Sequence, residues 1–195
     1  MNFKKRVYNN RSDFFNDLSF FFKNIPNFIK SIYKKRINAA FREKLMVAVS
    51  AVLDCKYCSW LHTEIALSKG VGREEIKKIL GKEMGKLSED EAIALIFAQH
   101  YSEMGGRPEK EAEERFYKYY GKERARDILN YIRAIYFGNL AGNTVDALLS
   151  RIKGKPAEES NIWSELIIFL ILSPYFFIIL PIVASIHHFL YWIKK

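Results

Sequence analysis

Two cysteines and a nearby histidine could carry out redox chemistry in this sequence. Cys55 and Cys58 are the only cysteines of the 195-residue chain, and His62 follows four residues after the second. On an α-helix these three positions lie at roughly 0°, 300° and 340° around the axis, so they share one face. We therefore expect both sulfurs and the imidazole to lie close together.

The residues around this motif predict an environment that activates a thiol. Asp54 is suited to be the N-cap of a helix, which would place Cys55 and Cys58 in its first turn. Unpaired backbone N–H groups and the helix dipole favour a thiolate there. Upstream, Glu43 enters an apolar helical segment. It is either a buried proton carrier or a carboxylate solvated at the end of a helix.

These residues also resemble a known family. Glu43, followed twelve residues later by the run Cys55-Lys-Tyr-Cys58-Ser-Trp-Leu-His62, looks like the signature of the alkylhydroperoxidase D-like branch of the carboxymuconolactone decarboxylase family. The resemblance covers roughly residues 25 to 150 and is strongest over residues 43 to 62. It implies an all-helical and usually oligomeric fold.

The resemblance also implies a role for each residue of the motif. Cys58 would attack a hydroperoxide, Cys55 would resolve the product as a disulfide, and Glu43 and His62 would relay protons. The sulfurs would carry the electrons, so no organic cofactor and no metal are expected. An external dithiol or protein reductant would have to restore the thiols.

Three further residues are candidates to line the site. Some peroxidase members of the family have a histidine where Tyr57 stands, so the proton path here would differ. The stretch 137–143 resembles the asparagine-containing last helix of the family core, where Asn139 and Asn143 would either line the site or join helices by hydrogen bonds. The decarboxylase branch lacks the cysteine pair, and decarboxylation is therefore not expected.

Other interpretations of the cysteine pair remain open. Free cysteines are often buried and inert. A zinc site would need ligands from His62, His100, His187 or His188. A thioredoxin-like module would need strands around the motif, and no alternating runs flank it.

The N-terminal segment, residues 1–36, is basic and amphipathic. It contains nine Lys or Arg against two Asp, which gives 9 − 2 = +7 of the chain's formal net charge of +9. Its apolar residues recur at helical spacing, and we expect one helix to end near Asn24 and a second to begin at Pro26. The phenylalanines would enter the core, or the helices would lie on anionic lipid. No nucleic-acid-binding motif accompanies the charge.

Residues 37–152 are predicted to form the redox domain. Expected helices include one opened by a capping box at Ser88 and Glu91, and two more over 108–120 and 122–152. Residues 153–161 then read as a linker.

A hydrophobic segment, residues 162–193, ends the chain. Leu166 to Ile186 contains no Asp, Glu, Lys or Arg, and these 21 residues would span roughly 31 Å as a helix, close to the ~30 Å hydrocarbon core of a bilayer. We expect a transmembrane helix or, because of Pro174 and Pro181, a re-entrant hairpin. The alternative is a hydrophobic helix that mediates oligomerisation. The basic N-terminal segment favours an anionic cytoplasmic leaflet, so the redox domain would face the cytoplasm.

The sequence thus predicts an all-α protein with a helical alkylhydroperoxidase D-like domain and a C-terminal membrane segment. The expected function is that of a thiol-dependent peroxidase, or disulfide oxidoreductase, that reduces hydroperoxides. The alternative is a non-enzymatic, membrane-anchored oligomeric scaffold with the same fold. Expected partners are membrane lipid and further copies of the chain, and no nucleic acid.

Overall fold

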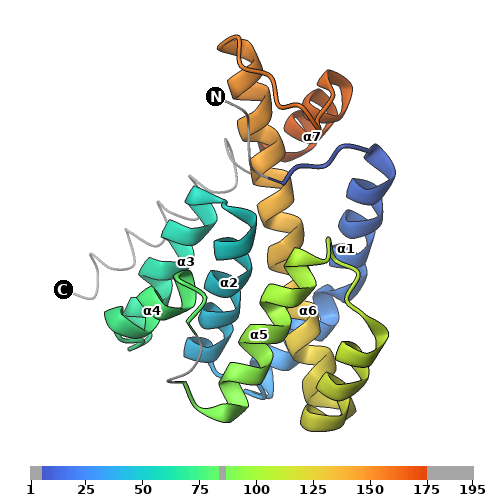
Figure 1. Ribbon diagram of the computed structural model, residues 1–195. Coiled ribbons are helices and arrows are strands. Elements are labelled where there is room, and N and C mark those ends of the chain that lie inside the picture. Colours follow the sequence, from blue (N-terminus) through green and yellow to red (C-terminus); the bar gives the residue numbers. More distant parts are fainter. Residues whose placement is uncertain (1–5, 84–86, 175–195) are drawn as a thin grey trace, which may run out of the picture.

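Helices form all the regular secondary structure of the described residues. The computed structural model describes residues 6–83 and 87–174 (Figure 1). No strand occurs within them, which confirms the predicted all-α class. The helices are α1 (Arg11–Tyr33), α2 (Ala39–Leu53), α3 (Lys56–Ser68), α4 (Arg73–Leu80), α5 (Glu89–Glu103), α6 (Lys110–Ile152) and α7 (Ile162–Pro174).

Helix α2 is the centre of the core. It contacts α3, α4, α5 and α6, and in Figure 1 it lies between α3 and α6. Leu45, Val47, Val49 and Leu53 are fully buried although they point in different directions around the helix. A helix whose apolar residues are buried in several directions lies in the interior of a protein. The elements that surround α2 are therefore the ones that can position a side chain such as Glu43.

Helix α6 is a long element interrupted once. Gly121 has φ 71° and ψ 161°, a backbone conformation that is accessible to glycine and unfavourable for other residues. The interruption agrees with the predicted boundary between helices over 108–120 and 122–152. The first of these begins at Lys110, with Glu109 as N-cap, slightly later than Pro108.

The predicted break in the N-terminal segment is wrong. Helix α1 is continuous from Arg11 to Tyr33 with Pro26 inside it. Proline removes one hydrogen bond from a helix interior, but Phe14, Phe21 and Phe28 lie on both sides of Pro26 and pack on α6. The ring centroids of Phe14 and Phe21 lie 5.8 and 5.9 Å from that of Phe137. The ring centroid of Phe28 lies 5.6 Å from that of Tyr131. Contacts on both halves hold the helix together across the proline.

Helix α1 nevertheless has a second apolar face. Phe22, Ile29 and Ile32 are 60%, 62% and 55% exposed, and the exposed Lys23 and Lys30 lie beside them. Phe14, Phe21 and Phe28 therefore pack on the core, whereas Phe22 faces outward.

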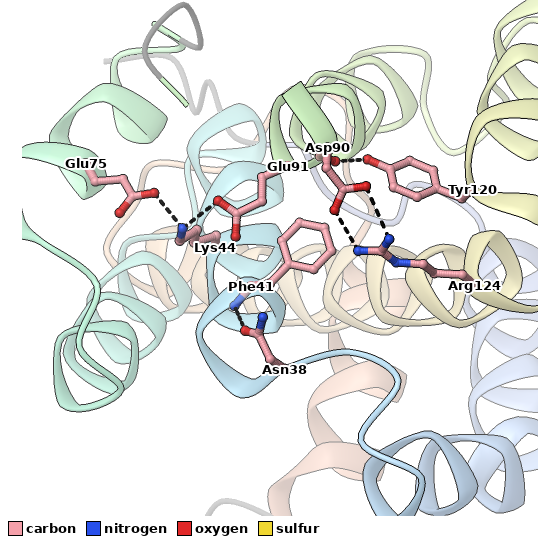
Figure 2. Close-up of polar contacts among 8 residues, drawn as sticks. All are labelled: Asn38, Phe41, Lys44, Glu75, Asp90, Glu91, Tyr120 and Arg124. Carbon is pink, nitrogen blue, oxygen red and sulfur yellow. Dashed lines mark hydrogen bonds and ion pairs between the residues drawn. The ribbon is translucent and has the colours of Figure 1, made fainter. Parts of the chain in front are cut away.

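Polar contacts tie α2 to its neighbours (Figure 2). Lys44 Nζ lies 2.5 Å from Glu75 on α4 and 2.7 Å from Glu91 on α5. Asp90 on α5 accepts both guanidinium hydrogen bonds of Arg124 on α6, at 3.2 and 2.7 Å. The start of α5 is fixed by these ion pairs. Ser88 is its N-cap, as predicted, but makes no capping hydrogen bond through its side chain.

The first part of the C-terminal hydrophobic segment docks on the domain. In α7, Glu165 is fully buried and its carboxylate accepts two hydrogen bonds from Arg151 on α6, at 2.7 and 2.8 Å. Within residues 6–83 and 87–174 no helix combines the length and apolar character needed to span a membrane. The predicted membrane segment, 162–193, extends beyond Pro174, and its remainder lies outside the described residues.

Candidate functional site

A tight turn between α2 and α3 positions the cysteines. Asp54 is the C-cap of α2 in the left-handed conformation, with φ 53° and ψ 36°, which a short polar residue such as aspartate tolerates. The expectation that Asp54 caps the redox helix is therefore wrong. Cys55 is the N-cap of α3, and its Sγ accepts a hydrogen bond from the backbone N–H of Cys58 at 3.4 Å.

Cys55 and Cys58 form a disulfide, with their Cα atoms 5.3 Å apart. Cys55 is 1% exposed, whereas Cys58 is partly buried. Cys55 faces α6 at Gly142, where a Cβ atom would lie 3.6 Å from its Sγ. The disulfide thus lies at the start of α3. Its Cys55 sulfur is enclosed, and its Cys58 sulfur is more accessible.

A carboxylate–imidazole pair joins α2 to α3 near the cysteines. Oε2 of Glu43 lies 2.7 Å from Nδ1 of His62. A carboxylate accepts hydrogen bonds, so Nδ1 carries the proton and Nε2 is free to act on another group. Glu43 is only 4% exposed. Glu43 is thus buried and not a carboxylate solvated at the end of a helix.

The pKa of Glu43 is set by opposing effects. Burial raises the pKa of this carboxyl, but the hydrogen bond and charge of His62, followed by those of Arg42, outweigh burial and leave it below its usual value. Glu43 is therefore ionised at neutral pH.

Sequence reasoning missed Arg42. Its Nε donates to Oε1 of Glu43 at 3.1 Å, and its guanidinium lies 5.9 Å from the ring centroid of Tyr131 on α6. Consecutive residues on a helix point in different directions, so adjacency gave no reason to pair Arg42 with Glu43. The guanidinium of Arg42 thus contacts Glu43 and also lies over an aromatic ring of α6.

Helix geometry sets Cys58 beside His62. The two residues are four apart on α3, and residues with this spacing are neighbours on a helix surface. The structure thus brings together the four predicted site residues through one disulfide, one hydrogen bond and one helical turn.

The three candidate lining residues have different positions. Tyr57 is 67% exposed in the first turn of α3. Asn143 donates its amide to the carbonyl of Leu53 at 2.8 Å, two residues before Cys55, so it holds the end of α2 in place. Asn139 is fully buried and donates at 2.7 Å to Ile135 in its own helix.

His100 lies apart from this site. His100, on α5, lines a separate apolar cavity with Phe97 and Phe116. In the part of the chain that the structure describes, no group of three or more His, Cys, Asp or Glu side chains could hold a metal ion.

The fold and site define a class: an all-helical protein with a Cys-x-x-Cys disulfide at the start of a helix beside a buried Glu–His pair. Residues 21–83 match the model of the carboxymuconolactone decarboxylase family. The matched third of the chain runs from within α1 through α4 and contains all four site residues. No curated protein and no solved structure matches the chain.

Proposed function

We propose that the chain is a thiol-dependent peroxidase of the alkylhydroperoxidase D-like type. The observation that carries this proposal is the buried Glu43, 2.7 Å from His62, one helical turn from the more accessible cysteine of a disulfide-forming pair. The family match supports the proposal because some members of the family reduce alkyl hydroperoxides.

In the first step the Cys58 thiolate attacks one oxygen of a hydroperoxide. The S–O bond forms as the O–O bond breaks, and the leaving alkoxide takes a proton relayed by His62. The products are an alcohol and a sulfenic acid on Cys58. Glu43 supports this step by stabilising the imidazolium that delivers the proton.

In the second step the Cys55 sulfur attacks the sulfenic sulfur of Cys58. The disulfide forms, and the hydroxyl leaves as water with the proton of the thiol. An external dithiol then reduces the disulfide, which returns the two electrons that the peroxide removed. N-cap placement of Cys55 suits this cycle, since the start of α3 stabilises the thiolate that reduction releases.

Thiol counting under hydroperoxide tests the proposal. The fully reduced chain, freed of excess reductant, is mixed with a small alkyl hydroperoxide and its thiols are counted over time. We expect both thiols to disappear at equal rates, with one alcohol formed for each pair. Retention of both thiols while a small-molecule dithiol control is oxidised would favour the non-enzymatic scaffold.

We also propose that the redox domain acts at the cytoplasmic face of a membrane. The exposed Phe22, Ile29 and Ile32 of α1, flanked by Lys23 and Lys30, suit an anionic lipid surface. Flotation with phosphatidylserine vesicles measures membrane binding of the wild type and of a variant in which Phe22, Ile29 and Ile32 are all changed to Ser. Binding equal to that of the wild type would remove α1 from the contact.

Assembly into a homo-oligomer is proposed from the family resemblance. Light scattering on the full chain measures the mass of the particle. An active monomer of 22.8 kDa would contradict the proposal.

A further inference from the structure

A second cavity, unrelated to the cysteine site, lies between the N-terminal residues, α1, the loop after α5 and α6. Its volume is about 690 Å³, in the range of small-molecule sites. None of the four proposed redox residues lines it. Its walls carry arginine and tyrosine side chains for which the peroxidase proposal has no use.

Arg133 on α6 is the least satisfied of these groups. Its guanidinium stacks on the ring of Phe20 on α1, 3.4 Å from the ring centroid. Its Nε atom is buried and has no hydrogen-bond partner among the described residues, and no carboxylate there lies within ion-pair distance of its guanidinium. An unpaired guanidinium beside a cavity is suited to bind an anion, because its donors form a planar fork that matches two oxygens.

Two tyrosines add neutral donors to the same cavity. The rings of Tyr101 and Tyr136 meet edge to face, with centroids 5.5 Å apart. Gly106, at φ +81°, allows the loop to approach them closely, since a Cβ there would lie 3.2 Å from Tyr136. Burial raises the pKa of Tyr136 to about 12, so its hydroxyl remains a donor at neutral pH. Their hydroxyl groups make no hydrogen bond to another described residue in the structure.

The carboxylates of the cavity restrict the charge of the ligand. Asp17 accepts from the hydroxyl of Tyr8 at 2.7 Å, and Asp13 accepts from Asn10 at 2.6 Å. Asp13 also forms a loose ion pair with Arg107, with Oδ1 4.0 Å from Nη2, and Glu103 and Glu159 line the cavity as well. These carboxylates would repel a doubly charged phosphate more strongly than a singly charged carboxylate. The tyrosine rings provide apolar surface for the body of an organic acid.

We propose that this cavity binds a small organic monocarboxylate, with Arg133 as the anchor and the hydroxyls of Tyr101 and Tyr136 as additional donors. Binding of the ligand at this site requires neither a chemical reaction nor a metal ion. Its occupancy is independent of the peroxidase proposal, so binding and turnover can be measured separately.

Calorimetric titration of the full chain near pH 7 with benzoate, methyl benzoate and inorganic phosphate tests the proposal. Benzoate should bind, whereas the uncharged ester and phosphate should bind at least about 10-fold more weakly. Arg133→Gln should weaken benzoate binding about 10- to 100-fold, as expected for loss of hydrogen bonds to a charged group. Arg126→Gln is the matched control, because Arg126 is an exposed residue of the same helix; its affinity should stay within about 2-fold of the wild type.

Tyr136→Phe keeps the ring and removes one donor, so it tests the site even if Arg133→Gln fails to fold. It should weaken benzoate about 3- to 10-fold. Equal affinity in Arg133→Gln and Arg126→Gln, or an unchanged affinity in Tyr136→Phe, would overturn the assignment of these residues. Equal binding of the ester, tighter binding of phosphate, or no benzoate binding at about 10 mM would overturn the ligand class.

Discussion

Glu43 and His62 form a direct link between the central helix of the core and the helix that carries the cysteines. Their 2.7 Å contact joins α2 to α3, and Arg42 occupies the other carboxylate oxygen of Glu43. Both oxygens are therefore held by charged or polar partners within an apolar helix. The imidazole is held at Nδ1, and in the proposed cycle its Nε2 atom would exchange a proton with a neighbouring group.

Replacing each cysteine should separate the two proposed roles. Cys58→Ser should abolish peroxide consumption, because it removes the attacking thiol. Cys55→Ser should leave a sulfenic acid on Cys58 that dimedone traps, since no resolving sulfur remains. Mass spectrometry of the treated variants locates the adduct. An adduct on Cys55 in Cys58→Ser, with none on Cys58 in Cys55→Ser, would reverse the assignment.

Glu43→Gln should slow turnover by about 10²-fold or more, because glutamine keeps the shape of the side chain but cannot stabilise an imidazolium. Steady-state peroxide consumption with excess dithiol measures the effect. Glu64→Gln is a matched control, since Glu64 is exposed on α3, and it should leave the rate unchanged. Equal rates for the two variants between pH 6 and 8 would make Glu43 a structural residue.

Acid should destabilise the wild type more than Glu43→Gln. The pKa of Glu43 is lower in the folded chain than its ordinary value of about 4.3. The stability due to its charge is therefore fully present above that value and is lost as the pH falls through the folded pKa. Urea unfolding at steps between pH 5 and 3 compares the two chains. Parallel loss of the free energy of unfolding would show that the charge contributes nothing to stability.

Lys44→Met should lower the free energy of unfolding by about 1 to 3 kcal/mol, because it leaves Glu75 and Glu91 without their shared partner. The Lys44 side chain is only 10% exposed. Lys77→Met removes an exposed lysine that pairs with Glu74 and should cost less than about 1 kcal/mol. Denaturant unfolding compares the two variants, and equal costs would mean that burial of Lys44 adds nothing.

Local pattern predicted much of the fold. Helical spacing predicted separate helices over 108–120 and 122–152, and the helix is interrupted between these ranges, at Gly121. Pro26 was misleading because a proline predicts a helix end from local chemistry alone, whereas here aromatic packing on α6 decides the outcome. The sequence alone does not show that both halves of α1 face the same helix.

Residue spacing in the sequence predicted which residues form the candidate site. It did not predict the detailed geometry of the site. Residues 55, 58 and 62 share a face in any helix that begins there. Asp54 looked like the N-cap because aspartate favours that position, yet it ends the preceding helix in a left-handed conformation. The contribution of Arg42 depends on Tyr131, about ninety residues away in the sequence, so no local pattern could reveal it.

The two sulfurs of the disulfide differ in their exposure to solvent. Cys55 is 1% exposed and enclosed by α6, so in the proposed cycle a reducing thiol from solution would meet the sulfur of Cys58. The mixed disulfide would then form on Cys58, and Cys55 would depart as a thiolate toward the backbone N–H groups at the start of α3. The same sulfur would receive both the oxidant and the reductant, while its partner exchanges electrons only inside the protein. Under this proposal, packing around Cys55 would direct reduction of the disulfide to Cys58, whatever the identity of the reductant.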